Sequence, residues 1–171
     1  ANSSGLVGKY FTIQSNQAVW GVQEQEVRSY KAPPSLALTE HWNYEDRGKD
    51  FFGGYCYMSQ GPLPKLWATT QFAGHGLWGD RLMAEMERYN HHVGLKMVGE
   101  MLPQEGNTVT LAEDKDQYGL PIARVNYDWC DNDKRMIEHA LRHMGQVLGA
   151  SGATEIWEQK DDTCHMNGGA R

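Results

Sequence analysis

The stretch from Lys134 to about Gly149 has the apolar spacing of a long amphipathic helix. Asp131 or Asn132 can cap its N-terminus, and Gly149 or Gly152 would end it. Its apolar residues recur at intervals of three and four and form one stripe: Ile137, Ala140, Leu141, Met144, Val147 and Leu148. A stripe of this kind is a face that packs against a core, so this helix is the clearest element that the sequence predicts.

Strand patterns lie on both sides of this helix. The segments Val93 to Met101, Asn107 to Ala112 and Ile122 to Tyr127 are separated by turn residues, which predicts an antiparallel meander. A short strand is expected at Thr154 to Glu158. Nearer the start, period-two stretches such as residues 19–22 and 54–58 predict further strands set among loops.

The middle of the chain contains a breaker, a flexible stretch and a second helix. Residues 61–64, Gly-Pro-Leu-Pro, form the breaker, and Gly74 to Gly79 is expected to be a flexible loop that lies over a site. Asp80 is expected to cap a helix that runs to about His91. The side chains expected on its core-facing side are Leu82, Met83, Met86 and Tyr89.

Composition excludes several classes of protein. The net charge is -6 and the Lys and Arg residues are scattered, so no nucleic-acid partner is expected. The three cysteines, Cys56, Cys130 and Cys164, are widely spaced and indicate free or buried thiols rather than a zinc or iron–sulfur site. No apolar run approaches the length of about 18 residues that spans a bilayer. No shift in composition divides residues 1–171, which are therefore expected to form one domain.

The segment from Cys164 to Arg171 carries the strongest functional signal. His165 has a side chain whose ordinary pKa of about 6.5 lets it accept and return a proton near neutral pH. Gly168 and Gly169 follow it, and glycines permit a flat cofactor or a substrate to approach the backbone closely. The pattern therefore indicates a catalytic segment with His165 as a general base.

Five segments in the right order resemble the C-terminal half of the glucose–methanol–choline (GMC) flavoprotein oxidoreductases. They are Asn2-Ser3-Ser4-Gly5-Leu6-Val7-Gly8-Lys9, Leu102-Pro103 with Asn107-x-Val109-Thr110-Leu111, Asp116-x-x-Gly119-Leu120-Pro121, Gly152-Ala153 and His165-x-x-Gly168-Gly169-x-Arg171. The resemblance implies an α+β fold, a mostly antiparallel sheet flanked by helices, that forms the substrate-binding domain and covers the open face of a flavin.

The resemblance also implies the chemistry of the site. His165 would accept the hydroxyl proton of an alcohol, sugar or polyol while the hydride passes to the flavin of FAD. Met166, Asn167 and Gly168 would lie beside the flavin, and Asn167 also beside the substrate. Oxygen, a quinone or a cytochrome partner all stay open as electron acceptors.

The chain also departs from the family pattern. It contains no G-x-G-x-x-G fingerprint, so most of the FAD would be bound by another part of the protein. The second catalytic His or Asn of the family has no counterpart before Arg171, and Gln14 stands where the family often has a histidine. Gly168-Gly169-x-Arg171 is closer to bacterial sugar and polyol dehydrogenases. The start has no signal-peptide pattern, but in a piece of a longer protein this leaves cytoplasm and periplasm equally open.

Aromatic residues offer a possible substrate pocket. Most of them are expected in the core: Trp42, Tyr44, Phe51, Phe52, Tyr55, Tyr57 and Phe72. Trp67, which precedes the Gly74 to Gly79 stretch, and Trp78, which lies within it, are the two that we expect to line the substrate pocket, because aromatic faces suit a sugar ring.

Two other functions stay open. One is a non-catalytic carbohydrate-binding or interaction module derived from this fold. The other is a metal-dependent hydrolase, since His139 and His143 are four residues apart on the predicted helix. A solvated helix face explains that pair more simply, so no metal is expected. His91 and His92 lie at a helix end, where the helix dipole accounts for them, and helix capping accounts better than a cation loop for the remaining candidates, Asp128, Asp131 and Asp133.

Overall fold

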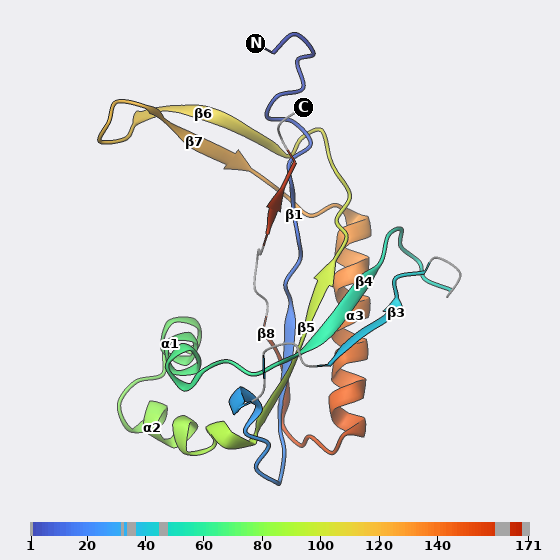
Figure 1. Ribbon diagram of the computed structural model, residues 1–171, viewed down its shortest axis with the longest axis vertical. Helices are drawn as coiled ribbons and strands as arrows, with labels where there is room; N and C mark the ends of the chain where they lie inside the picture. The colour runs from blue at the N-terminus through green and yellow to red at the C-terminus, as the bar shows by residue number, and fades with distance from the viewer. Residues whose placement is uncertain (1, 32, 34–36, 45–47, 160–164, 169–171) are drawn as a thin grey trace.

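The computed structural model describes residues 2–31, 33, 37–44, 48–159 and 165–168, and it has an α+β architecture (Figure 1). Its centre is a five-stranded antiparallel sheet with the strand order β3-β4-β5-β2-β8. These strands are β2 (Ala18–Val22), β3 (Leu38–Trp42), β4 (Tyr55–Gln60), β5 (His92–Gly99) and β8 (Ile156–Gln159). The expected fold class, a mostly antiparallel sheet flanked by helices, is confirmed.

The strands predicted at residues 19–22, 54–58, 93–101 and 154–158 correspond to β2, β4, β5 and β8. β3 was not predicted. It is an edge strand whose residues are mostly exposed and include Glu40 and His41, so it lacks the apolar alternation of a half-buried strand.

The predicted meander is wrong. β6 (Thr108–Lys115) and β7 (Pro121–Asn126) form a separate two-stranded sheet, because both edges of β5 are already paired, one with β4 and the other with β2. Figure 1 shows the β6–β7 hairpin projecting from one end of the molecule as an arm. A buried asparagine anchors its base: the Asn107 side chain donates to the Asp128 carbonyl at 3.1 Å and accepts from the Asp128 N–H at 2.9 Å.

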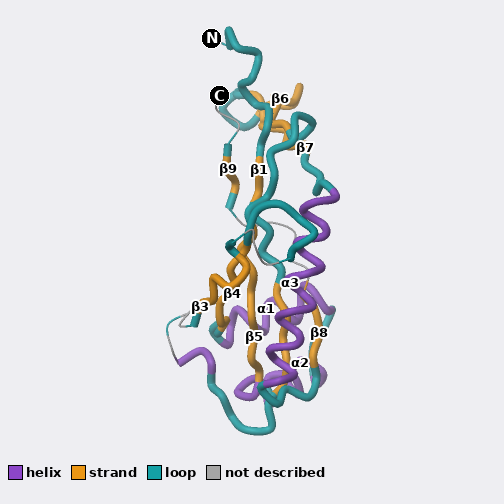
Figure 2. The backbone as a smooth tube through the Cα atoms, turned by 90° about the vertical axis from the view of Figure 1, so that its right-hand side faces the viewer, coloured by secondary structure: helices purple, strands orange, loops and turns teal. Residues whose placement is uncertain are grey.

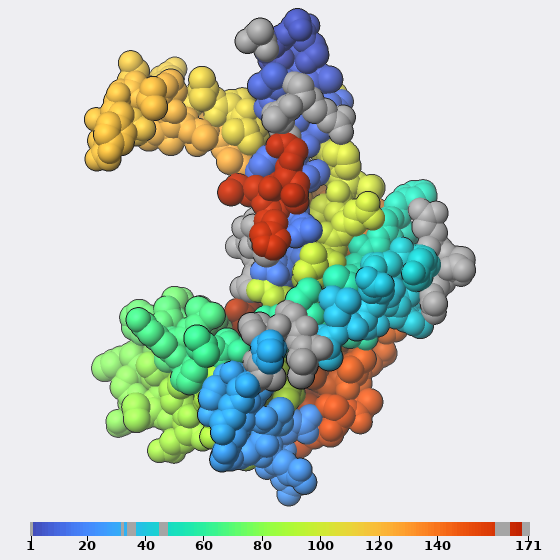
Figure 3. Space-filling model, in the orientation of Figure 1, coloured from blue at the N-terminus to red at the C-terminus, as the bar shows by residue number. Residues whose placement is uncertain are grey.

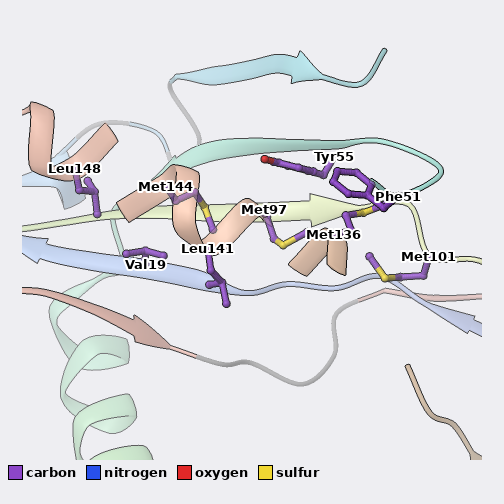
Figure 4. Packing of buried hydrophobic residues seen from close by; sticks show 10 residues of the cluster. Val19, Phe51, Tyr55, Met97, Met101, Met136, Leu141, Met144 and Leu148 are labelled. Atoms are coloured by element: carbon purple, nitrogen blue, oxygen red, sulfur yellow. The ribbon is translucent and has the colours of Figure 1, made fainter. Parts of the chain in front are cut away.

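Helix α3 (Asp131–Ala150) covers one face of the sheet and runs in front of the strands in Figure 2. The predicted stripe is buried at Ala140, Leu141, Met144 and Leu148, but Val147 is 42% exposed. Met136 was not in the predicted stripe and is fully buried. Figure 4 shows the methionine side chains that fill the space between α3 and the strands.

The predicted helix cap was wrong. Cys130 is the N-cap, and its N–H donates to the Asp133 carboxylate at 3.3 Å. The other Asp133 oxygen accepts from the Leu102 N–H at 3.1 Å, so this fully buried carboxylate ties the helix start to the chain that leaves β5. The separate prediction that Asp133 serves in helix capping is thus confirmed. The Asn132 side chain instead bonds the backbone of Phe52: its amide NH₂ donates to the carbonyl at 3.1 Å, and its oxygen accepts from the N–H at 2.7 Å.

Helices α1 (Pro64–His75) and α2 (Asp80–Glu87) lie on the other side of the strands (Figure 1). They pack on that face through a second cluster of buried residues: Ala18, Trp20, Trp67 and Tyr89. Two short 3₁₀ helices complete the fold, η1 (Ser29–Lys31) and η2 (Tyr89–His91). No helix in the described ranges has both the length and the apolarity to span a bilayer.

The sequence predicted a breaker at residues 61–64 and a flexible loop at residues 74–79, with no helix between them. Instead Pro64 occupies the start of the helix, where its missing N–H costs nothing, and Gly74 and His75 form the last turn. Gly76, at φ 65°, ends the helix. The predicted helix at 80–91 stops at Glu87, and Met83, expected in the core, is 63% exposed.

Candidate functional site

Two short strands bring the ends of the described chain together. β1 (Thr12–Ile13) pairs antiparallel with β9 (Met166–Asn167). The Gln14 N–H extends this pairing by donating to the His165 carbonyl at 3.0 Å. Because β1 leads directly into β2 of the central sheet, the predicted catalytic segment is fixed relative to that sheet (Figure 1).

The His165 side chain is exposed, and its Nδ1 lies 2.8 Å from Oε1 of Gln14. An amide oxygen can only accept a hydrogen bond, so this contact requires the proton on Nδ1. The lone pair of the neutral ring then lies on Nε2, the atom free to accept another proton. Gln14, whose role the sequence left open, therefore orients the imidazole and selects its tautomer.

The residues after His165 are exposed as well. The Met166 side chain is 70% exposed, and the Asn167 carbonyl accepts from the Thr12 hydroxyl at 3.2 Å. Gly168 has φ 76°, and a Cβ there would lie 3.2 Å from the Tyr10 carbonyl oxygen. Local backbone geometry therefore accounts for this glycine. The other residues of the predicted motif, Cys164, Gly169 and Arg171, lie outside the described residues.

A pocket of about 470 Å³ opens beside this segment. Its lining includes Gln14, Cys56, Val98, Glu100 and Asn167, which come from β1, β4, β5 and β9 and their ends. Burial raises the pKa of the Cys56 thiol, so this cysteine is not an activated nucleophile. The pocket combines polar side chains with β9, the strand that directly follows His165.

A second pocket, of about 630 Å³, lies between α1 and the sheet. Trp20, Trp67, Lys96 and Gln159 contribute to its lining. Lys96 and Val98 are two residues apart on β5, so they share the face that α3 does not cover and lie about 7 Å apart. The two pockets are therefore neighbours on one face of the sheet.

The two tryptophans predicted to bind substrate have different positions. Trp67 lines the pocket under α1, but it is only 1% exposed and its ring packs edge-on against Trp20 with 4.6 Å between centroids. Trp78 is 74% exposed on the link between α1 and α2 and lines neither of the two pockets. The structure thus brings Trp67, but not Trp78, to the face of the sheet opposite α3.

Trp20, Lys96 and Gln159 are among the pocket residues that were not predicted from the sequence. Lys96 is a charged residue within an otherwise apolar strand pattern, and that anomaly was a usable signal. Gln159 accepts a 2.7 Å hydrogen bond from the Trp20 indole, a contact between residues 139 positions apart that periodicity does not reveal.

His139 and His143 do not form a solvated helix face, contrary to the prediction. Both are partly buried and pack against Trp42 of β3, with ring centroids 4.6 Å and 4.5 Å away. The Tyr55 hydroxyl lies 2.9 Å from Nδ1 of His139. Across the described ranges, no three His, Cys, Asp or Glu side chains are grouped so that they could hold a metal ion.

This packing predicts a loss of stability in acid. Burial, with a smaller effect of His143, lowers the pKa of His139 to about 4. The unfolded chain, with a pKa of about 6.5, then binds more protons than the folded chain as the pH falls from 6.5 to 4. We expect the unfolding free energy to fall by roughly 2 kcal/mol across this window. The other charged groups that influence His139 are Lys49, Asp50 and Arg142.

Urea titrations at pH 7, 5.5 and 4.5 measure this effect. His139→Gln should flatten the pH dependence, whereas His75→Gln, at an exposed helix end, should leave it unchanged. If the unfolding free energy falls equally with pH in His139→Gln and in the parent protein, His139 is not the group responsible.

The remaining candidates have structural partners. His92, 2% exposed, lies 3.0 Å from the Glu85 carboxylate through its Nε2, and His91 Nδ1 lies 3.1 Å from the Gln23 carbonyl. These contacts attach the end of η2 to α2 and to the chain after β2.

Comparison with known proteins is consistent with this architecture. Residues 103–170 match the family described as GMC oxidoreductase. The chain is 31% identical over 163 residues to 2-methyl-1,2-propanediol dehydrogenase of Mycolicibacterium austroafricanum, an alignment that covers 91% of this chain and 29% of that relative. It is also 31% identical over 106 residues to the gluconate 2-dehydrogenase flavoprotein of Pantoea cypripedii, and this alignment covers 54% of this chain and 17% of that relative. The chain thus spans less than a third of either relative.

Proposed function

The chain belongs to the GMC oxidoreductase family, and we propose that it forms the substrate-binding part of an FAD-dependent enzyme that oxidises a CH–OH group of a sugar, polyol or other alcohol. The relatives with printed activities are dehydrogenases, one of a diol and one of gluconate. The position of His165 beside a polar pocket supports the same class of reaction.

The observation that carries the proposal is the contact between His165 and Gln14. With the proton of the neutral ring on Nδ1, the Nε2 lone pair accepts the hydroxyl proton of the substrate. The Gln14 side chain holds the ring through one hydrogen bond, and its backbone N–H donates to the His165 carbonyl. Transfer of a proton to such a positioned base contributes about 10²- to 10⁴-fold to rate.

The described residues fit a flavin at this place. Met166, Asn167 and Gly168 are all exposed, so this part of the chain is accessible to a flat ring. Met166, Asn167 and Gly168 would contact it from this chain, while the rest of the protein would bind most of the cofactor. FAD, when bound, supplies the hydride acceptor for the oxidation.

The pocket between α1 and the sheet, on the face opposite α3, supplies the substrate contacts in this proposal. Trp20 and Trp67 line it with aromatic rings that are 5% and 1% exposed, and Lys96 and Gln159 line it with polar side chains. This combination suits a polyhydroxylated substrate, which has both apolar CH faces and polar edges.

The test is to express the full gene product and look for flavin absorption and for oxidation of sugars and polyols with an artificial electron acceptor. A flavin spectrum with turnover supports the proposal. Sugar binding by a protein that lacks flavin would favour the non-catalytic module instead.

Gln14 allows a graded test of the base. In Gln14→Leu the Nδ1 proton loses its acceptor, and loss of a neutral hydrogen bond should lower kcat about 3- to 10-fold. In Gln14→Glu the new carboxylate should favour the imidazolium, so the acid limb of the pH–rate profile should move to higher pH. The measurement is kcat and kcat/KM against pH. An unchanged acid limb in Gln14→Glu argues against the contact.

A further inference from the structure

The β6–β7 hairpin has two different faces. The register pairs Val109 with Val125 and Leu111 with Ala123. Because side chains alternate along a strand, these four lie together on one face. The opposite face carries Thr108, Thr110, Arg124 and Asn126. Over these four pairs the ribbon is therefore apolar on one side and polar on the other, the pattern of a sheet with one buried face, and Ile122 next to them is apolar on the polar side.

The apolar face is nevertheless exposed. Leu111 is 72% exposed and Val125 47%, and every residue of β7 is exposed. A single two-stranded hairpin is at best marginally stable in water by itself. Within the described ranges, no helix or other sheet packs against β6 or β7 closely enough to cover this face.

The base of the hairpin is held firmly. The Val109 N–H donates to the Gly8 carbonyl at 2.7 Å, and the Phe11 N–H donates to the Asn107 carbonyl at 3.0 Å. Gly8 has φ 84°, and a Cβ there would collide with the Val109 carbonyl. The segment that anchors the hairpin then continues into β1, which pairs with the His165 segment. The arm therefore projects from the same end of the molecule as the candidate catalytic residue.

The arm borders a hollow. Figure 3 shows a concave side of the molecule, with the hairpin above it, α1 and α2 below it, and β9 along its inner edge. A body that fills this hollow can contact the hairpin and lie beside the His165 segment at the same time. In the proposed function the flavin also lies beside the His165 segment.

We propose that the apolar face of the β6–β7 hairpin is covered by the flavin-binding part of the same protein. This inference rests on the proposed function. The gluconate 2-dehydrogenase flavoprotein supports the occupant, because the aligned part accounts for only 17% of that relative and the rest lies outside the alignment. A second copy of this chain would have no reason to lie beside His165, whereas the flavin-binding part has to be there.

Hydrogen exchange of the full-length, flavin-loaded protein tests the proposal. Leu111→Lys places a charge on the apolar face, and Thr110→Lys places the same charge one residue away on the polar face. Loss of one buried leucine contact changes an equilibrium by about tenfold or more. We expect Leu111→Lys to speed amide exchange of residues 108–126 at least about tenfold, and Thr110→Lys to change it less than about twofold.

Mass measurement in solution separates the possible occupants. Equal exchange in both variants with the flavin still bound would overturn the covered face. An oligomer that dissociates only in Leu111→Lys would overturn the proposed occupant in favour of a second copy. A full-length protein that never binds flavin would refute the proposed function itself, and with it this inference. If Leu111→Lys has the same molar mass in solution as the parent protein and shows the expected faster exchange, the proposal is supported.

Discussion

Replacement of His165 by alanine is expected to lower kcat for alcohol oxidation by about 10²- to 10⁴-fold, the usual contribution of a positioned general base. The ring is exposed, so its removal leaves no buried cavity, and flavin content and unfolding should stay at the level of the parent protein. The measurement is the single-turnover rate of flavin bleaching by substrate in the full-length enzyme.

A base can be told apart from a binding residue by rescue. Added imidazole should restore part of the rate in His165→Ala, because it supplies the missing proton acceptor in the space that the ring leaves. His165→Asn keeps a polar side chain without a basic nitrogen and should be as slow as His165→Ala. A variant that turns over normally refutes the assigned role, and a defect confined to KM would assign His165 to binding alone.

The second large effect concerns Trp67. Its ring is 1% exposed and packs against Trp20 and His92, with centroid distances of 4.6 and 4.9 Å. Trp67→Ala should therefore destabilise the protein by about 3–5 kcal/mol, the range for removing a large buried aromatic side chain. Trp67→Phe should cost less because it keeps an aromatic ring. Urea unfolding of the variants measures these differences.

Trp78 provides the matched comparison. It is 74% exposed, so Trp78→Ala should change the unfolding free energy by less than about 0.5 kcal/mol. If Trp67→Ala unfolds like the parent protein but binds substrate more weakly, then Trp67 serves the pocket and not the core. Equal destabilisation by both substitutions would contradict their positions in the fold.

Elements with a regular apolar period could be predicted from the sequence. α3 has one stripe, and β2, β4, β5 and β8 alternate or are rich in strand-forming residues. α1 could not be found in this way, because its fully buried positions are Trp67 and Gln71 while Leu66 and Phe72 are exposed. Helix formation there follows from packing on the sheet, which local periodicity does not report.

Strand partners were a separate difficulty. The segments of β5, β6 and β7 are consecutive and each was predicted, yet β5 pairs with β2 and β4. Pairing of this kind is decided by contacts between residues far apart in the chain, and a meander is only the shortest way to connect neighbouring strands.

The candidate site likewise has one part that could be predicted from the sequence and another that could not. His165 could be selected because its chemistry and the following glycines are local in the sequence. Its hydrogen-bond partner Gln14 lies 151 residues away and could not be identified as such. The pockets beside it also combine strands from both halves of the chain, so their outlines appear only in the folded structure.

The pairing of β1 with β9 has a consequence for when the site exists. It closes a loop that contains the whole central sheet, and it joins only two residues from each strand. Closing so long a loop costs conformational entropy, and the few hydrogen bonds of this pair do not offset that cost until the sheet has formed. The pair is therefore expected to assemble last and to open first. The imidazole can thus lose its alignment in a brief local opening while β2 to β8 stay intact, which makes readiness for reaction a property separate from global stability.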